Sequence, residues 1–169
     1  VLNRYFRNMD ASPLAKRNSL QLFTDGQEKF QALFEDIRAA KETVHVEYYA
    51  FFNDTIGNQF LDVLIEKLHE GVEVYLIYDP WGSPGANKKF FARYVDAGGK
   101  VAPFITSRDM IRKTRLNYHL HRKIVVIDGK IGWTGGFNVG DQYLNVTEKF
   151  GYWRDTPARK STRLNSSHQ

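Results

Sequence analysis

The feature that most constrains the fold is an alternation of apolar, strand-like runs with helix-like stripes between residues 19 and 104. Residues 43–52 are rich in β-branched and aromatic side chains, and residues 72–78 form a continuous apolar run. Between them, apolar residues recur at helical spacing over residues 58–69, and Gly71 follows as a natural helix stop. Alternation of this kind favours βαβ units. We therefore expect an α/β fold with a mainly parallel mixed sheet flanked by helices on both faces.

The same criteria predict further elements on either side of this region. Strands are expected at residues 19–23 and 100–104, and helices at residues 27–41 and 87–97. The adjacent residues Tyr48 and Tyr49 are interpreted as core side chains of the strand at residues 43–52.

The composition indicates one globular domain. Of the 169 residues, 42% are hydrophobic, and no run approaches the roughly 18 apolar residues of a membrane span. The chain has no cysteine, which excludes a disulfide framework and a thiolate metal site. It begins with neither Met nor the features of a secretory signal, so we expect it to be a piece from the middle of a longer protein.

The segment 157–169 differs from the rest of the chain. It holds three basic residues and no acid, so without it the basic residues fall from 24 to 21 against 19 acids, and the net charge from +5 to +2. This near balance argues against a nucleic-acid partner. The segment also resembles the translated read-through of a sequencing adapter. We therefore predict an N-terminal linker at residues 1–18, a catalytic domain at 19–156 and a non-native tail at 157–169.

The segment with the clearest chemical content is HRKIVVIDGKIGWTGGFN, residues 121–138. Because alternate residues of a strand share a face, His121 and Lys123 project together. Near neutral pH an imidazole can act as an unprotonated nucleophile or, when protonated, as a general acid. The Lys123 ammonium supplies a compact positive charge for phosphate oxygens. We interpret the pair as the centre of a site for phosphate chemistry.

Two glycines and an amide complete the predicted site. Gly135 and Gly136 let the backbone come close to an anion and offer N–H groups to it, and Asn138 adds a neutral amide donor. Only two carboxylates, Asp128 and Asp141, are near in the sequence, which is few for a divalent cation. We therefore expect no metal and no cofactor.

Asp128 is interpreted as a turn residue that positions the catalytic motif. Asp128-Gly129 is a strong hairpin signal between strands expected at residues 122–127 and 130–134. Asp128 lies an odd number of residues after His121 and Lys123, so along a strand it would face the opposite side. A carboxylate in contact with a phosphate would also repel it.

The spacing His-x-Lys, four residues, Asp and then Gly-Gly-x-Asn resembles the catalytic motif of the phospholipase D superfamily. Other stretches resemble the first catalytic half of bacterial cardiolipin synthases: VHVEYYAFF (44–52), Tyr78-Asp79 with Gly82-Ser83, GGFNVGDQY (135–143) and GYWRDT (151–156). The likeness covers about residues 19–156. One departure is His119-Leu120, where the family pattern has Arg-Asn.

The resemblance implies a mechanism. In this family two such motifs meet face to face, one histidine forms a phosphohistidine, and the other protonates the leaving alcohol. His121 would be the nucleophile, and Lys123 and Asn138 would hold the phosphate. The substrate would be phosphatidylglycerol, exchanged to give cardiolipin and glycerol.

The resemblance also implies the partners of the chain. The second motif would come from a missing C-terminal half or from a second copy, so the isolated fragment is expected to be nearly inactive. The full-length protein would sit in the bacterial cell membrane through a missing N-terminal segment.

Three further carboxylates are candidates for supporting roles. Glu47 shares a strand face with His45, either as a polar pair in the sheet or as a substrate contact. Asp79 follows a presumed parallel strand, where ligands of open α/β sheets tend to bind. Asp141 either orients His121 or caps a local turn or helix.

Two alternative functions stay open at this point. A single-motif nuclease or phosphodiesterase of the same superfamily would build its site by homodimerisation. A non-catalytic module would only bind a phosphate or a lipid head group.

Overall fold

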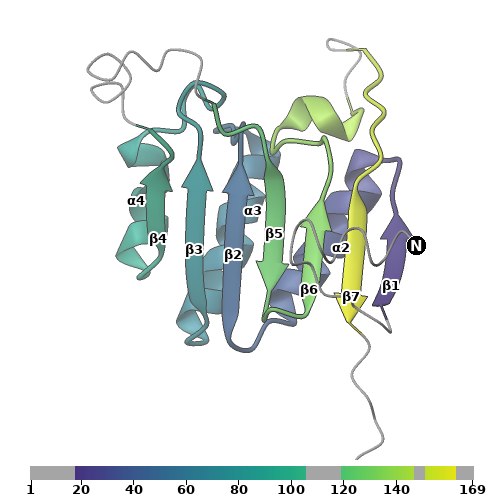
Figure 1. Ribbon diagram of the computed structural model, residues 1–169. Coiled ribbons are helices and arrows are strands. Elements are labelled where there is room, and N and C mark those ends of the chain that lie inside the picture. Colours follow the sequence, from purple (N-terminus) through teal and green to yellow (C-terminus); the bar gives the residue numbers. More distant parts are fainter. Residues whose placement is uncertain (1–17, 106–118, 147–150, 163–169) are drawn as a thin grey trace, which may run out of the picture.

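The computed structural model describes residues 18–105, 119–146 and 151–162. Its strands are β1 (Asn18–Leu22), β2 (Thr43–Tyr48), β3 (Glu73–Tyr78), β4 (Lys100–Pro103), β5 (Lys123–Ile127), β6 (Ile131–Thr134) and β7 (Ala158–Thr162). Its helices are α2 (Gly26–Arg38), α3 (Thr55–His69), α4 (Lys88–Asp96) and the short 3-10 helix η1 (Asp141–Leu144). The strands form one sheet in the order β1-β7-β6-β5-β2-β3-β4 (Figure 1).

Side-chain caps set where the α-helices begin. Asp25, Asp54 and Asn87 each stand one residue before a helix and accept a hydrogen bond from a backbone N–H of its first turn. These caps satisfy donors that have no partner within the helix. In the described ranges, none of the helices has both the length and the apolar character that crossing a membrane requires.

The α/β class and the mixed sheet are confirmed, but the expected majority of parallel pairs was wrong for the described residues. Only β2-β3 and β3-β4 are parallel, and the other four neighbouring pairs are antiparallel. A parallel pair of neighbours needs a helical crossover, whereas the tight turn at Asp128-Gly129 joins β5 and β6 as an antiparallel hairpin. Both turn residues have positive φ, as the primed hairpin turns require.

The expectation of helices on both faces was also wrong for the described helices. Helices α2, α3 and α4 all lie on the same face of the sheet (Figure 1). The path β1, α2, β2, α3, β3, α4, β4 advances across the sheet in one direction. Right-handed crossovers that advance the same way place their helices on the same side, and only a reversal of direction would place a helix on the other.

The core lies between this face of the sheet and the helices. Alternate residues of β2, namely Val44, Val46 and Tyr48, are buried there with an aromatic group from α2 and α3 that includes Phe30 and Phe60. The intervening residues of β2 and β3 point to the opposite face, where Ile77 is 42% exposed. The helix-facing side therefore carries the apolar packing of the described chain.

Strand β7 lies within the segment that the sequence reading left outside the catalytic domain. It pairs with β1 and β6, and Arg159 binds Asp36 of α2 with Nε to Oδ2 at 2.6 Å. The same carboxylate accepts the indole N–H of Trp133 at 2.8 Å. Strand pairing uses backbone groups, so almost any extended segment can fill this place. The foreign origin of the tail stays a prediction.

One edge of the sheet brings chemically different segments together. Tyr48 at the end of β2 pairs with Tyr78 at the end of β3, and also with Lys123 at the start of β5. The carboxyl ends of two parallel strands thus lie beside the first residue of the antiparallel strand. This is the edge at which open α/β sheets usually bind ligands.

Candidate active site

His121 and Lys123 lie together at this edge, as expected. Lys123 opens β5 with its side chain on the helix-facing side, where the residue is only 6% exposed. His121 lies two residues earlier and is exposed. The Lys123 Nζ is 3.2 Å from His121 Nε2 and also donates to the His121 carbonyl oxygen at 3.0 Å. An imidazole and an amine therefore lie next to each other at the edge of the sheet where β2 and β3 end.

The contact is compatible with one tautomer of a neutral imidazole. An ammonium has three donors and no acceptor, so beside the Lys123 ammonium His121 Nε2 is the acceptor and the ring proton is on Nδ1. This assignment rests on the hydrogen-bond partners. The lone pair at Nε2 is what a nucleophilic histidine needs, and Lys123 stands where a phosphate next to that nitrogen would be held.

Two opposing effects act on the charge of Lys123. Burial lowers the pKa of Lys123, and the negative charge of Asp155 raises it in part. Asp155 packs against Gly136, where a Cβ would overlap its carboxylate. The sequence reading assigned Asp155 no role, although the stretch GYWRDT that contains it had been noticed. Asp155 therefore supports the ammonium form that a phosphate site requires.

The predicted glycine pair is close to the same segment. A Cβ on Gly135 would overlap the backbone of Pro157, and one on Gly136 would meet Asp155. The missing side chains thus let residues 155–157 approach the motif. That their N–H groups also contact a phosphate stays a prediction.

Tyr49 supplies an aromatic wall that the sequence reading missed, because it had placed this residue in the core. Its ring centroid is 4.8 Å from that of His121 and 5.3 Å from the Lys123 Nζ. Neighbouring strand residues face opposite ways, so Tyr48 fills the core while Tyr49 turns away from it. The ring offers the ammonium a weak cation–π attraction and restricts the imidazole.

Asn138 is buried and braces the loop around the site. Its Oδ1 accepts the Ala50 N–H at 3.1 Å, and its Nδ2 donates to the Tyr143 hydroxyl at 2.8 Å. The side chain therefore ties residues 135–139 to the end of β2. That the amide also holds a phosphate stays a prediction.

Asp79 fixes the approach to His121. Its carboxylate is fully buried and accepts the Leu120 N–H at 2.8 Å and the Trp81 N–H at 2.9 Å. The imidazole of His119 lies at 3.5 Å from the same group. Asp79 therefore acts on the site through the backbone that carries His121.

Asp128 lies at the far end of β5 from His121. It accepts the N–H groups of Lys41, Glu42 and Thr43 at 2.8–2.9 Å. Burial raises the pKa of Asp128, but these three donors outweigh burial and the net shift is downward. This arrangement matches the turn and support role expected of it.

The two other candidates are outside the catalytic pair. Both carboxylate oxygens of Asp141 accept N–H groups at the start of α3, from Thr55 at 3.1 Å and Ile56 at 2.8 Å, which is the capping alternative. Glu47 pairs with Ile124, so it lies on the opposite face from Lys123. Its strand neighbour His45 stacks on Tyr75, with ring centroids 5.0 Å apart.

Ser83 holds the end of β2 in place and was noticed only as part of a Gly82-Ser83 pair. Its buried hydroxyl accepts the Phe51 N–H at 2.9 Å and donates to the Tyr49 carbonyl oxygen at 3.1 Å. A Cβ on Gly82 would overlap that same Tyr49 carbonyl oxygen. The loop after β3 is thus closely packed against the residue that forms the aromatic wall.

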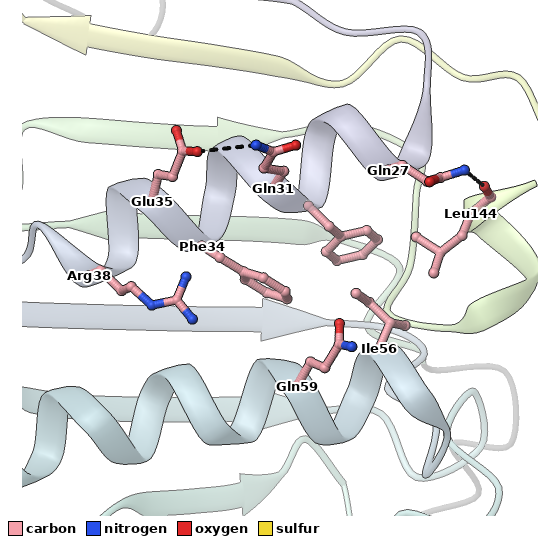
Figure 2. Close-up of a pocket in the computed structure, with 9 residues that line it drawn as sticks. Gln27, Gln31, Phe34, Glu35, Arg38, Ile56, Gln59 and Leu144 are labelled. Carbon is pink, nitrogen blue, oxygen red and sulfur yellow. Dashed lines mark hydrogen bonds between the residues drawn. The ribbon is translucent and has the colours of Figure 1, made fainter. Parts of the chain in front are cut away.

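A groove of considerable volume lies away from His121 and Lys123. It measures about 480 Å³ and runs between α2 and α3, with Phe34 and Ile56 in its floor and Gln31, Glu35 and Arg38 along its rim (Figure 2). None of the motif residues lines it. Size alone therefore does not locate the chemistry, and the convergence of His121 and Lys123 does.

Comparison with known proteins decides the family. The model of a family described as "Cardiolipin synthase, PLD-like domain" matches residues 33–151. The chain belongs to this family. As a PLD-like domain of the cardiolipin synthase family, it has curated relatives of nearly 50% identity.

Two such relatives are cardiolipin synthases. The enzyme of Listeria monocytogenes serotype 4b is 47% identical over 150 residues, which cover 89% of this chain and 31% of that protein. The major cardiolipin synthase ClsA of Bacillus subtilis is 49% identical over 142 residues, covering 84% and 30%. This PLD-like domain thus spans less than a third of the length of the curated relatives it matches.

Solved structures show the same fold. NucT from Helicobacter pylori superposes with a TM-score of 0.63 at 19% identity, covering 85% of this chain and 86% of that one. At this identity the likeness concerns the fold alone.

Proposed function

We propose that this chain forms one half of the active site of a phospholipase D-type phosphatidyltransferase that makes cardiolipin. The observation that carries the proposal is the convergence of His121 Nε2 and Lys123 Nζ, 3.2 Å apart, at the edge of the sheet where ligands of such folds bind. The identity of 47% to a cardiolipin synthase supports the choice of reaction.

The reaction proceeds in two displacements at one phosphorus. His121 Nε2 attacks the phosphate of phosphatidylglycerol, the bond to the glycerol oxygen breaks, and glycerol leaves with a proton from the histidine of the second motif. The hydroxyl of a second phosphatidylglycerol then returns its proton to that histidine and attacks the phosphohistidine. The new P–O bond completes cardiolipin, and the P–N bond breaks to restore His121.

The residues around His121 divide the remaining tasks. Lys123 balances charge on the phosphate oxygens, and the free amide hydrogen of Asn138 adds a neutral donor. Asp155 opposes the loss of charge that burial favours at Lys123, and Asp79 and Asp128 hold the backbone before and after β5 in place. No step needs a metal or a cofactor.

The second motif comes from the rest of a longer protein in this proposal. The chain matches 31% of the length of its relative, so the remainder is long enough to contain another half-site. A second copy of the chain is the alternative source. Anchoring in the bacterial cell membrane belongs to a segment outside this chain, and nucleic acid is not a partner.

Trapping of the covalent intermediate tests the proposal. We expect the full-length protein, quenched during turnover with phosphatidylglycerol labelled in its phosphate, to carry label on histidine. The label should be absent in His121→Ala and present in His45→Ala, because His45 is exposed on the opposite face of the sheet. Label in His121→Ala would contradict the proposal, as would cleavage of nucleic acid without cardiolipin formation.

A further inference from the structure

A second lysine is buried beneath the catalytic pair. Lys29 of α2 is 3% exposed, its Nζ is 3.0 Å from the Tyr48 hydroxyl, and it lies 3.6 Å from the centre of the Phe30 ring. No carboxylate among the described residues forms an ion pair with it. Burial holds the pKa of Lys29 well below its ordinary value, because an ammonium without a counter-ion is strongly disfavoured away from water.

Lys29 is connected to Lys123 through Tyr48. Tyr48 and Lys123 are direct partners in the β2-β5 register, so their side chains are neighbours on the helix-facing side. All three residues also line one small cavity of about 10 Å³, together with Gly135 and Phe137. A space of this size holds about one water molecule. The amine, the hydroxyl and the catalytic ammonium thus share one enclosed volume.

The charges around this volume favour a single ammonium in it. Lys123 faces the cavity from β5, and Asp155 acts on Lys123 from the segment before β7. Of the acids on α2, Glu28 and Glu35 are exposed, and Asp36 is engaged by Arg159 of β7. Two ammonium groups at one small cavity would repel each other, and only Lys123 has a carboxylate assigned to it.

We propose that Lys29 is a positioning residue of the phosphate site, which holds Lys123 in place through Tyr48 and does so as an uncharged amine. This inference rests on the proposed function and deepens it. The Lys29 amine donates to the Tyr48 hydroxyl, and burial keeps that hydroxyl protonated. The hydroxyl hydrogen is therefore available at the small cavity that Lys123 also lines.

A charge series at position 29 separates this role from that of a second phosphate-binding cation. We compare Lys29→Met, which is neutral, with Lys29→Arg, which is always charged, in the full-length protein. The readout is the dissociation constant of inorganic phosphate by calorimetry, with thermal melting as the measure of folding. We expect Lys29→Met to weaken phosphate binding about threefold and Lys29→Arg by about tenfold or more.

Tyr48→Phe extends the test, since Lys29→Arg can fail to fold in so small a space. We expect Tyr48→Phe to match Lys29→Met, and the double variant to bind phosphate no more weakly than either single one, because both interrupt the same support. The matched control is Lys67→Met, which removes another buried lysine that is bound to the Arg38 carbonyl oxygen and Glu70. It should leave phosphate binding unchanged.

The outcomes are distinct. Tighter phosphate binding by Lys29→Arg than by Lys29→Met, with both folded, overturns the inference, as do effects of Lys29→Met and Tyr48→Phe that add in full. Failure of the proposed function has a separate sign. The wild-type protein would then carry no labelled histidine in the trapping experiment, whereas phosphate binding by the variants could still be measured.

Discussion

At the scale of single residues, the carboxylates of this chain differ in the groups with which they interact. Asp79, Asp128 and Asp141 each accept backbone N–H groups and thereby fix a loop, a turn and a helix start. Asp155 accepts the Thr156 N–H in the same way, and it also acts on the Lys123 ammonium through its charge. The same functional group therefore holds the backbone in all four of these places and is in addition an electrostatic partner in one of them.

The scaffold role of Asp128 predicts a stability that depends on pH. We expect Asp128→Ala to lower the free energy of unfolding of the chain at pH 7 by about 1 kcal/mol, because three backbone donors lose their acceptor. The folded-state pKa lies below the unfolded one, so this contribution is present above the unfolded pKa and is lost as pH falls through the folded pKa.

Urea unfolding at pH 7 and at pH 3 measures this effect. The difference between Asp128→Ala and wild type should be smaller at pH 3, whereas the exposed Asp62→Ala should show little effect at pH 7. An Asp128→Ala deficit that grows on acidification would contradict the assignment.

Sequence reasoning brought His121 and Lys123 together, as the structure has them, but not their surroundings. His121 and Lys123 follow from strand parity, which is local. The contacts of Tyr49 and Asp155 depend on the β2-β5 register and on the packing of residues 151–157, which join positions far apart in the chain. Periodicity contains no information about such pairings.

At the scale of elements, the loop after β3 and the end of β2 act as one unit. Ser83 bonds to both sides of this junction, and Gly82 lies against the Tyr49 carbonyl oxygen with no room for a side chain. Backbone atoms cannot move aside as the end of a flexible side chain can.

A pair of glycine substitutions tests this junction. We expect Gly82→Ala to reduce the free energy of unfolding by about 1–3 kcal/mol and to lower catalysis by the full-length protein, since the clash displaces the aromatic wall beside His121. Gly132→Ala in β6 is the control, because a Cβ there meets nothing within 4 Å. Equal stability and activity of the two variants would show that the junction tolerates movement.

The individual elements were predicted well, whereas their arrangement was not. Helical stripes and caps are local signals, and α2, α3 and α4 appear close to the expected ranges. The order of strands depends on pairings between distant segments, and the side on which a helix packs depends on the direction of each crossover. That is why the hairpin was expected correctly while the balance of parallel and antiparallel pairs was not.

At the scale of the whole molecule, the proposed reaction takes one histidine and one lysine from this chain and needs a second proton carrier from elsewhere. It corresponds to 31% of its relative from Listeria monocytogenes. We expect the purified, monomeric 169-residue chain to bind inorganic phosphate yet to form little or no cardiolipin from phosphatidylglycerol, because no second motif protonates the leaving glycerol.

Product analysis of this chain beside the full-length protein provides the measurement. Cardiolipin formation by the monomer would contradict the half-site proposal. Activity that appears only with dimerisation would assign the second motif to another copy of the chain.

The pairing of β1 with β7 has a consequence for synthesis on the ribosome. Ser19 and Ser161 meet across this pair although they lie 142 positions apart. β1 therefore has no strand to pair with until residues 158–162 have been translated. Closure of the sheet comes after the catalytic motif has been made, and a nascent chain stalled before residue 158 would present the motif on an unfinished sheet.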